Sequence, residues 1–108
     1  MKMIYAIIQS EDADNVIEVL NQHRFMVTRL STTGGFLRKG NTTLMIVTKQ
    51  ERVDDVIKIL QEECGKRRQM TCTMPYEGSP LVNSTVMIPV EAGGATIFVV
   101  DVERFEKV

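Results

Sequence analysis

Met3-Ile4-Tyr5-Ala6-Ile7-Ile8 lies near the start of this 108-residue chain and is apolar at both odd and even positions. A strand with one face in water alternates apolar and polar residues, so this strand is predicted to be covered on both faces. The third predicted strand, Leu44-Met45-Ile46-Val47, has the same character. The chain therefore predicts a sheet that needs cover on both sides.

Two helices are predicted from apolar residues at helical spacing. Ser10 is predicted to cap the first helix, whose stripe consists of Ala13, Val16, Ile17 and Leu20. A capping box from Thr48 to Glu51 is predicted to start the second helix, whose stripe consists of Val53, Val56, Ile57, Leu60 and Cys64. Gly65 is predicted to end that helix, and the basic run 66–68 is interpreted as a solvated cap at its negative end.

The remaining strands are weaker. Residues 25–30 form the second predicted strand, and a short exposed strand follows Gln69. Pro89 marks the strand 85–90 as an edge strand. Residues 91–94 are predicted to form a hairpin turn into the last strand, Ala95 to Val102, and a short tail completes the chain.

This order predicts an α+β fold: a single-domain (1–108) ferredoxin-like βαββαβ sandwich with a long insertion before the last strand. The first and third strands are central in that topology. Two helices cover only one face of the sheet, yet both central strands are apolar on both faces. Identical subunits are the simplest cover for the second face, so an oligomer is predicted, and a ring of three fits the topology.

Composition limits the function. Lys and Arg total 13 against 14 Asp and Glu, a balance that argues against a general binder of nucleic-acid polymers but not against one small anionic ligand. Two cysteines and one histidine argue against a four-ligand metal site. No catalytic constellation, P-loop or dinucleotide fingerprint is present, so we expect neither an enzyme nor a cofactor. The sequence shows no signal peptide or membrane span, and a cytoplasmic protein is expected.

The stretch from Thr32 to Thr43 is the least ordinary part of the chain. Its glycines (34, 35 and 40) can turn backbone N–H groups toward one point, which suits a phosphate or carboxylate. Arg38 and Lys39 would add positive charge, and Phe36 offers a face on which a base can stack. A plain turn between two strands is the alternative interpretation.

One run carries a resemblance to a known family: Phe25-x-Val27-Thr28-Arg29-Leu30-x-Thr32-Thr33-Gly34-Gly35-Phe36-Leu37-Arg38-x-Gly40-Asn41-Thr42-Thr43. This run closely resembles the PII-like receptors for cyclic di-AMP of Gram-positive bacteria. The same resemblance extends to Arg52-Val53-Asp54, Pro89-Val90-Glu91 and Gly93-Gly94-Ala95-Thr96-x-Phe98-Val99. The resemblance covers essentially the whole chain in register.

The resemblance implies a PII-like homotrimer that binds cyclic di-AMP in clefts between subunits, transmits the signal to protein partners by reordering loops, and catalyses no reaction. It also implies which residues bind the ligand. Adenine and phosphate would be held by Thr28, Gly35, Phe36, Leu37 and Asn41. Phe98 would be supplied by the neighbouring subunit.

Two positions depart from the family pattern. The family usually has Asn-Phe-Arg where this chain has Arg24-Phe25-Met26, and the family arginine contacts the ligand phosphate. On a strand, Arg24 and Met26 would share a face, so Arg24 is expected to replace that charge, whereas Arg29 would point the other way. The second departure is Lys107, which stands where the family has a ligand-contacting glutamine. The alternatives are therefore a PII-like sensor of another nucleotide such as ATP, and an interaction module that has lost its ligand.

Overall fold

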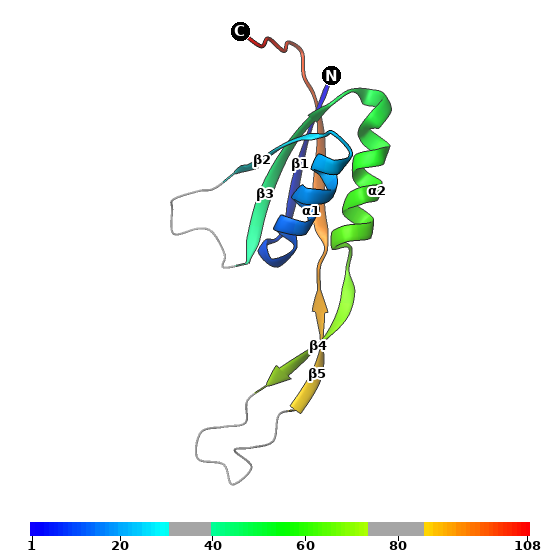
Figure 1. Ribbon diagram of the computed structural model, residues 1–108. Coiled ribbons are helices and arrows are strands. Elements are labelled where there is room, and N and C mark those ends of the chain that lie inside the picture. The colour runs from blue at the N-terminus through cyan, green and yellow to red at the C-terminus, as the bar shows by residue number, and fades with distance from the viewer. Residues whose placement is uncertain (31–39, 74–85) are drawn as a thin grey trace.

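The computed structural model describes residues 1–30, 40–73 and 86–108 (Figure 1). Its elements are β1 (Lys2–Gln9), α1 (Ser10–Gln22), β2 (Met26–Leu30), β3 (Asn41–Thr48), the 3-10 turn η1 (Gln50–Arg52), α2 (Val53–Cys64), β4 (Arg67–Thr73), β5 (Val86–Ala92) and β6 (Ala95–Asp101). Four strands form one antiparallel sheet in the order β2-β3-β1-β6, and β4 pairs with β5 in a separate two-stranded ribbon. This arrangement of helices and antiparallel strands is consistent with the predicted ferredoxin-like sandwich.

The hydrophobic core lies between the sheet and the two helices, which both pack on the same face (Figure 1). Even-numbered residues of the central strands point into this core. The largest fully buried side chains are Ile4, Ile8, Val16, Leu20, Leu44, Ile46, Val56, Leu60 and Cys64. The predicted helical stripes and central strands meet here, except that in α2 the core contains Ile59 and not the predicted Ile57.

The other side of the sheet, called the open face below, carries the odd-numbered residues of β1 and β3 and the even-numbered residues of β2 and β6. Strand register aligns Thr28, Met45, Tyr5 and Phe98 in one row across the four strands. The next row runs from Met26 to Val100. Met26 is 63% exposed, Phe98 52% and Val100 47%. Neither helix covers this apolar face, which confirms the premise of the predicted oligomer.

The ribbon of β4 and β5 extends beyond the end of the sheet (Figure 1). The predicted hairpin at residues 91–94 is wrong, because β5 pairs with β4 whereas β6 pairs with β1. Gly93 and Gly94 have φ angles of 80° and 102° and turn the chain from the ribbon into the sheet. Glycine adopts such angles without a steric penalty, which explains the Gly-Gly pair at this corner.

The predicted helix caps are also wrong. α1 begins at Ser10 itself, whose hydroxyl forms a hydrogen bond with that of Thr42 (2.7 Å). Thr48 is the buried last residue of β3, and neither η1 nor α2 has a side-chain cap. Ser10 thus bonds to a hydroxyl on a distant strand instead of capping its own helix, so the local capping rule does not decide its role. The basic run 66–68 does not cap α2 either, because β4 begins at Arg67.

Arg67 instead fastens the ribbon to the sandwich. Its guanidinium donates to both carboxylate oxygens of the buried Asp12, at 2.6 and 3.3 Å, and this bidentate pair joins β4 to the first turn of α1. Close by, Gly94 N–H donates to the Cys64 carbonyl at 2.7 Å. Burial, reinforced by the Asp12 charge, raises the pKa of the Cys64 thiol to about 11, which keeps it protonated at neutral pH.

Gly93→Ala tests how closely this corner is packed. A Cβ at Gly93 would lie 2.3 Å from the Gly65 carbonyl oxygen and 2.5 Å from Arg67 Nη1, whereas a Cβ at Gly40 would meet nothing within 4 Å. Both glycines have positive φ, so either alanine costs about 1–3 kcal/mol in backbone strain. We expect Gly93→Ala to lower the free energy of unfolding further than Gly40→Ala in denaturant titrations. Equal losses would contradict the close contact.

Candidate functional site

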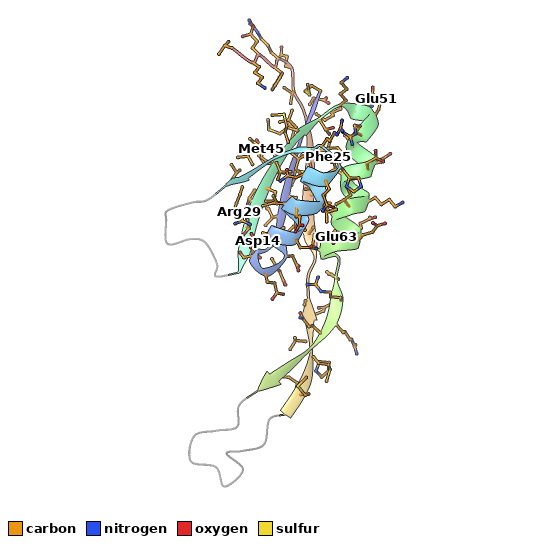
Figure 2. All side chains as sticks on the ribbon, in the orientation of Figure 1. Asp14, Phe25, Arg29, Met45, Glu51 and Glu63 are labelled. Carbon is orange, nitrogen blue, oxygen red and sulfur yellow. The ribbon has the colours of Figure 1, made fainter. Side chains whose placement is uncertain are left out.

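Thr28 lies in the middle of β2 on the open face. Its neighbour across the strand pair is Met45, which Figure 2 labels on β3. The side chain of Thr28 is exposed, so its hydroxyl is available to a ligand. The strand-to-strand register fixes the position of Thr28, because a slip by one residue would turn it into the helical core.

Asn41 is the first residue of β3 and pairs with Gln9 at the end of β1. Ser10 N–H donates to the Gly40 carbonyl at 2.6 Å, directly before Asn41. This hydrogen bond, with that between the hydroxyls of Ser10 and Thr42, anchors the start of β3 to the start of α1. Asn41 is exposed on the same face as Thr28, and its amide can both donate to and accept from a purine edge.

Phe98 lies on β6, at the opposite edge of the open face from Thr28. Three strand spacings separate the two residues, which corresponds to about 14 Å. Within one chain, Thr28 and Phe98 therefore do not line the same small site. A ligand that contacts both residues of one chain would have to span this distance across the open face.

The predicted site residues Gly35, Phe36 and Leu37 lie outside the described residues. The residues at the two ends of their segment are described. Leu30, the last residue of β2, pairs with Thr43 of β3. The segment therefore starts and ends beside Thr28 and Asn41.

Arg24 is not on a strand, and the geometric reason given for its role is wrong. β2 begins only at Met26, and Arg24 occupies a left-handed turn with φ of 63°. Arg24 N–H donates to the Asn21 carbonyl and Phe25 N–H to the Leu20 carbonyl, the two hydrogen bonds of a Schellman motif. The helix end, and not strand alternation, thus sets the direction of Arg24. Its contact with a ligand stays a prediction.

The other two positions of this segment behave as the sequence predicts. Arg29 points to the helical face, where its guanidinium pairs with Asp14 of α1 at 2.5 Å (Figure 2). Met26 points to the open face, two residues before Thr28. Every residue of β2 is described, and none of them presents a cation to the open face.

A pocket of about 260 Å³ at the end of the sheet was not foreseen from the sequence. Asn41, Gln9, Lys66, Gly94 and Thr96 belong to its lining. Gln9 had no predicted role, and Lys66 was interpreted as part of a solvated helix cap. No local pattern marks either residue, because the pocket forms only where α2 ends beside β1 and β6.

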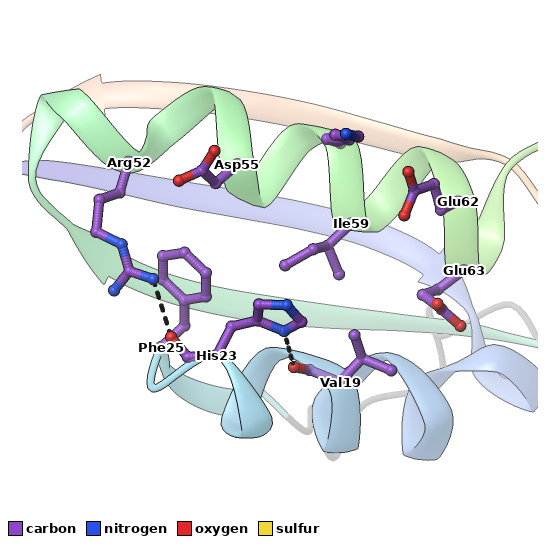
Figure 3. A pocket seen from close by; sticks show the side chains of 9 residues that line it. Val19, His23, Phe25, Arg52, Asp55, Ile59, Glu62 and Glu63 are labelled. Atoms are coloured by element: carbon purple, nitrogen blue, oxygen red, sulfur yellow. Dashed lines mark hydrogen bonds between the residues drawn. The ribbon is translucent and has the colours of Figure 1, made fainter.

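A second pocket, of about 400 Å³, lies in the groove between α1 and α2 (Figure 3). Phe25 and Ile59 form part of its lining, and the Arg52 guanidinium stacks 3.9 Å from the centre of the Phe25 ring. Arg52 also donates to the His23 carbonyl at 2.9 Å. These contacts satisfy the C-terminal end of α1, so Arg52 has a structural role here. None of the predicted site residues that the structure describes lines this groove.

Comparison with known proteins identifies the family of the chain. The sequence model of a family described as "Cyclic-di-AMP receptor" matches residues 1–108, the whole chain. This chain belongs to the cyclic-di-AMP receptor family. A crystal structure of a functionally unknown protein from Pediococcus pentosaceus ATCC 25745 is similar, with 36% sequence identity and a TM-score of 0.77. The match covers 99% of this chain and 96% of that protein.

Membership of this receptor family supports binding of cyclic di-AMP and a role in signalling. Within residues 1–30, 40–73 and 86–108, no helix is long and apolar enough to cross a membrane. The same residues contain no group of three or more His, Cys, Asp or Glu side chains placed to hold a metal ion.

Asn41→Ala tests whether the anchored start of β3 belongs to the ligand site of this receptor-family member. The exposed Asn41 side chain makes no hydrogen bond within the described residues, so its amide is free to bind a ligand and its removal should not disturb the fold. We expect Asn41→Ala to abolish nucleotide binding. The oligomeric state should not change, and size-exclusion chromatography with light scattering is the control. Unchanged affinity in calorimetric titration would remove Asn41 from the site.

Proposed function

We propose that this chain is a PII-like homotrimeric signal receptor in the cytoplasm, which binds cyclic di-AMP between subunits. The observation that carries the proposal is the open face: an exposed apolar surface that places Thr28 and Asn41 toward one side and Phe98 on the opposite edge strand. Binding would reorder residues 32–41 and 75–84 and so favour the state that engages a protein partner. No catalytic step, metal or cofactor is involved.

The need for another copy follows from two independent arguments. The exposed side chains of Met26, Phe98 and Val100 form apolar surface that association would remove from water. In addition, Thr28 and Phe98 of one chain lie about 14 Å apart, too far for both to contact a single adenine and its adjoining phosphate. A ring in which the open faces point inward satisfies both arguments and repeats the same cleft at each interface.

The chemistry of the proposed site suits a cyclic dinucleotide. The Thr28 hydroxyl can donate to a phosphate oxygen, and the Asn41 amide can read a purine edge. Phe36 and Phe98 of a neighbouring copy would stack on the two faces of an adenine. Arg24 would add a charge-assisted contact, whereas Gly35 and Leu37 would contribute close backbone and apolar contacts.

A second candidate function rests on Met26. This apolar side chain is exposed on the open face two residues from Thr28, where the family pattern has a phosphate-binding arginine. A charge-assisted hydrogen bond to phosphate accounts for about ten- to a hundredfold in affinity. Its loss favours a different nucleotide such as ATP, or an interaction module without a ligand.

Isothermal titration of the full chain with cyclic di-AMP, with ATP and cyclic di-GMP alongside, separates these functions. We expect saturable binding of cyclic di-AMP alone, with one ligand per subunit. Binding of ATP alone would establish the second candidate. If none of the three nucleotides gave a binding signal, the chain would be an interaction module.

Met26→Arg tests the missing phosphate contact. Because Met26 shares the open face with Thr28, an arginine there can reach the same ligand. We expect cyclic di-AMP to bind about tenfold more tightly or better. Arg29→Met is the matched control: it changes charge on the helical face, where Arg29 pairs with Asp14, and should leave affinity unchanged. No gain from Met26→Arg would mean that Arg24 already supplies this contact or that the pocket has changed.

A further inference from the structure

Lys66 is the residue between α2 and β4 that precedes the ion-paired Arg67. Arg67 is neutralised by Asp12, but Lys66 has no ion pair or hydrogen-bond partner among the residues that the structure describes. Glu11 lines an adjoining pocket with Asn41 and is not paired with Lys66 either. The ammonium group of Lys66 is therefore a free positive charge on this part of the surface.

The stem of Lys66 is held in a defined place. A Cβ placed on Gly94 would lie 3.4 Å from Lys66 Cγ and 3.8 Å from Lys66 Cε. The Lys66 side chain therefore crosses the Gly93–Gly94 corner. The Gly94 N–H bonds to the Cys64 carbonyl at 2.7 Å, and the Gly93 N–H bonds to Gln9 Oε1 at 2.9 Å. These bonds fix the corner against α2 and β1, and thereby the surface on which Lys66 lies.

Lys66 and Asn41 line the same pocket of about 260 Å³, together with Gln9 and Thr96. The pocket thus combines a free ammonium group with an amide that can read a purine edge. Met45, the partner of Thr28, lies four residues along β3 from Asn41, which corresponds to about 13 Å. Thr28 and Lys66 would therefore contact different parts of one ligand. A cyclic dinucleotide can satisfy both residues because it carries two phosphates.

We propose that Lys66 pairs with a phosphate of the nucleotide whose base contacts Asn41. The inference rests on the proposed function. It assigns the positive charge to the corner between α2 and β6, because β2 offers no cation to the open face and Arg29 is turned toward α1. A compact ammonium group on a flexible stem is suited to such a point-charge contact with phosphate.

The experiment is a titration of the full chain and its Lys66→Gln, Lys66→Arg and Lys58→Gln variants with cyclic di-AMP at two salt concentrations. Lys58→Gln is the matched control, because it removes the same charge from the exposed surface of α2, in the groove that faces away from Asn41. We expect Lys66→Gln to weaken binding about ten- to a hundredfold. Lys66→Arg, which keeps the charge, should stay within a few-fold of the wild type.

Salt gives an independent readout. Screening weakens charge pairs, so the wild-type affinity should fall with ionic strength more steeply than that of Lys66→Gln. Equal affinity of Lys66→Gln and wild type would overturn the inference. So would a loss in Lys58→Gln, or in Lys66→Arg, as large as the loss in Lys66→Gln. Wild-type protein that binds no nucleotide would overturn the proposed function and this inference together, so the two failures are distinguishable.

Discussion

The structure depends on one imbalance: a sheet whose central strands are apolar on both faces has helices on only one of them. On the helical side, Ile4, Leu44 and Ile46 are fully buried. On the open side, Phe98 and Val100 remain about half exposed. Contiguous apolar surface of this kind marks an interaction site. In the proposed trimer, association would cover the open face, and the ligand site would form at the same place.

The second constraint is the corner at which the ribbon leaves the sandwich. The Arg67–Asp12 pair, the Gly93 contact with Gln9 and the Gly94 contact with Cys64 hold both strands of the ribbon to the core. A two-stranded ribbon has little stability by itself, so these contacts determine where it begins. Gln9 belongs both to this corner and to the pocket that contains Asn41. In the proposed site, ligand and ribbon would therefore share Gln9.

Much of the candidate site could be predicted because it depends on local alternation. Thr28 and Met26 share the open face and Arg29 faces the helix, since a strand turns successive side chains to opposite sides. The same rule misplaced Arg24, because a Schellman turn ends α1 there and the strand starts two residues later. The predicted caps were also wrong: Ser10 is the first residue of α1 and bonds to Thr42, and Thr48 is the last residue of β3.

By itself, the sequence determined the number and order of the main elements, the apolar character of both sheet faces and the family resemblance, because periodicity and motif spacing are written along the chain. Only the tertiary structure decided that Gly93–Gly94 joins two sheets instead of closing a hairpin, that Arg67 reaches Asp12, and that Lys66 shares a pocket with Asn41. Such pairings join residues far apart in the sequence, and no local pattern records which of them packing will bring together.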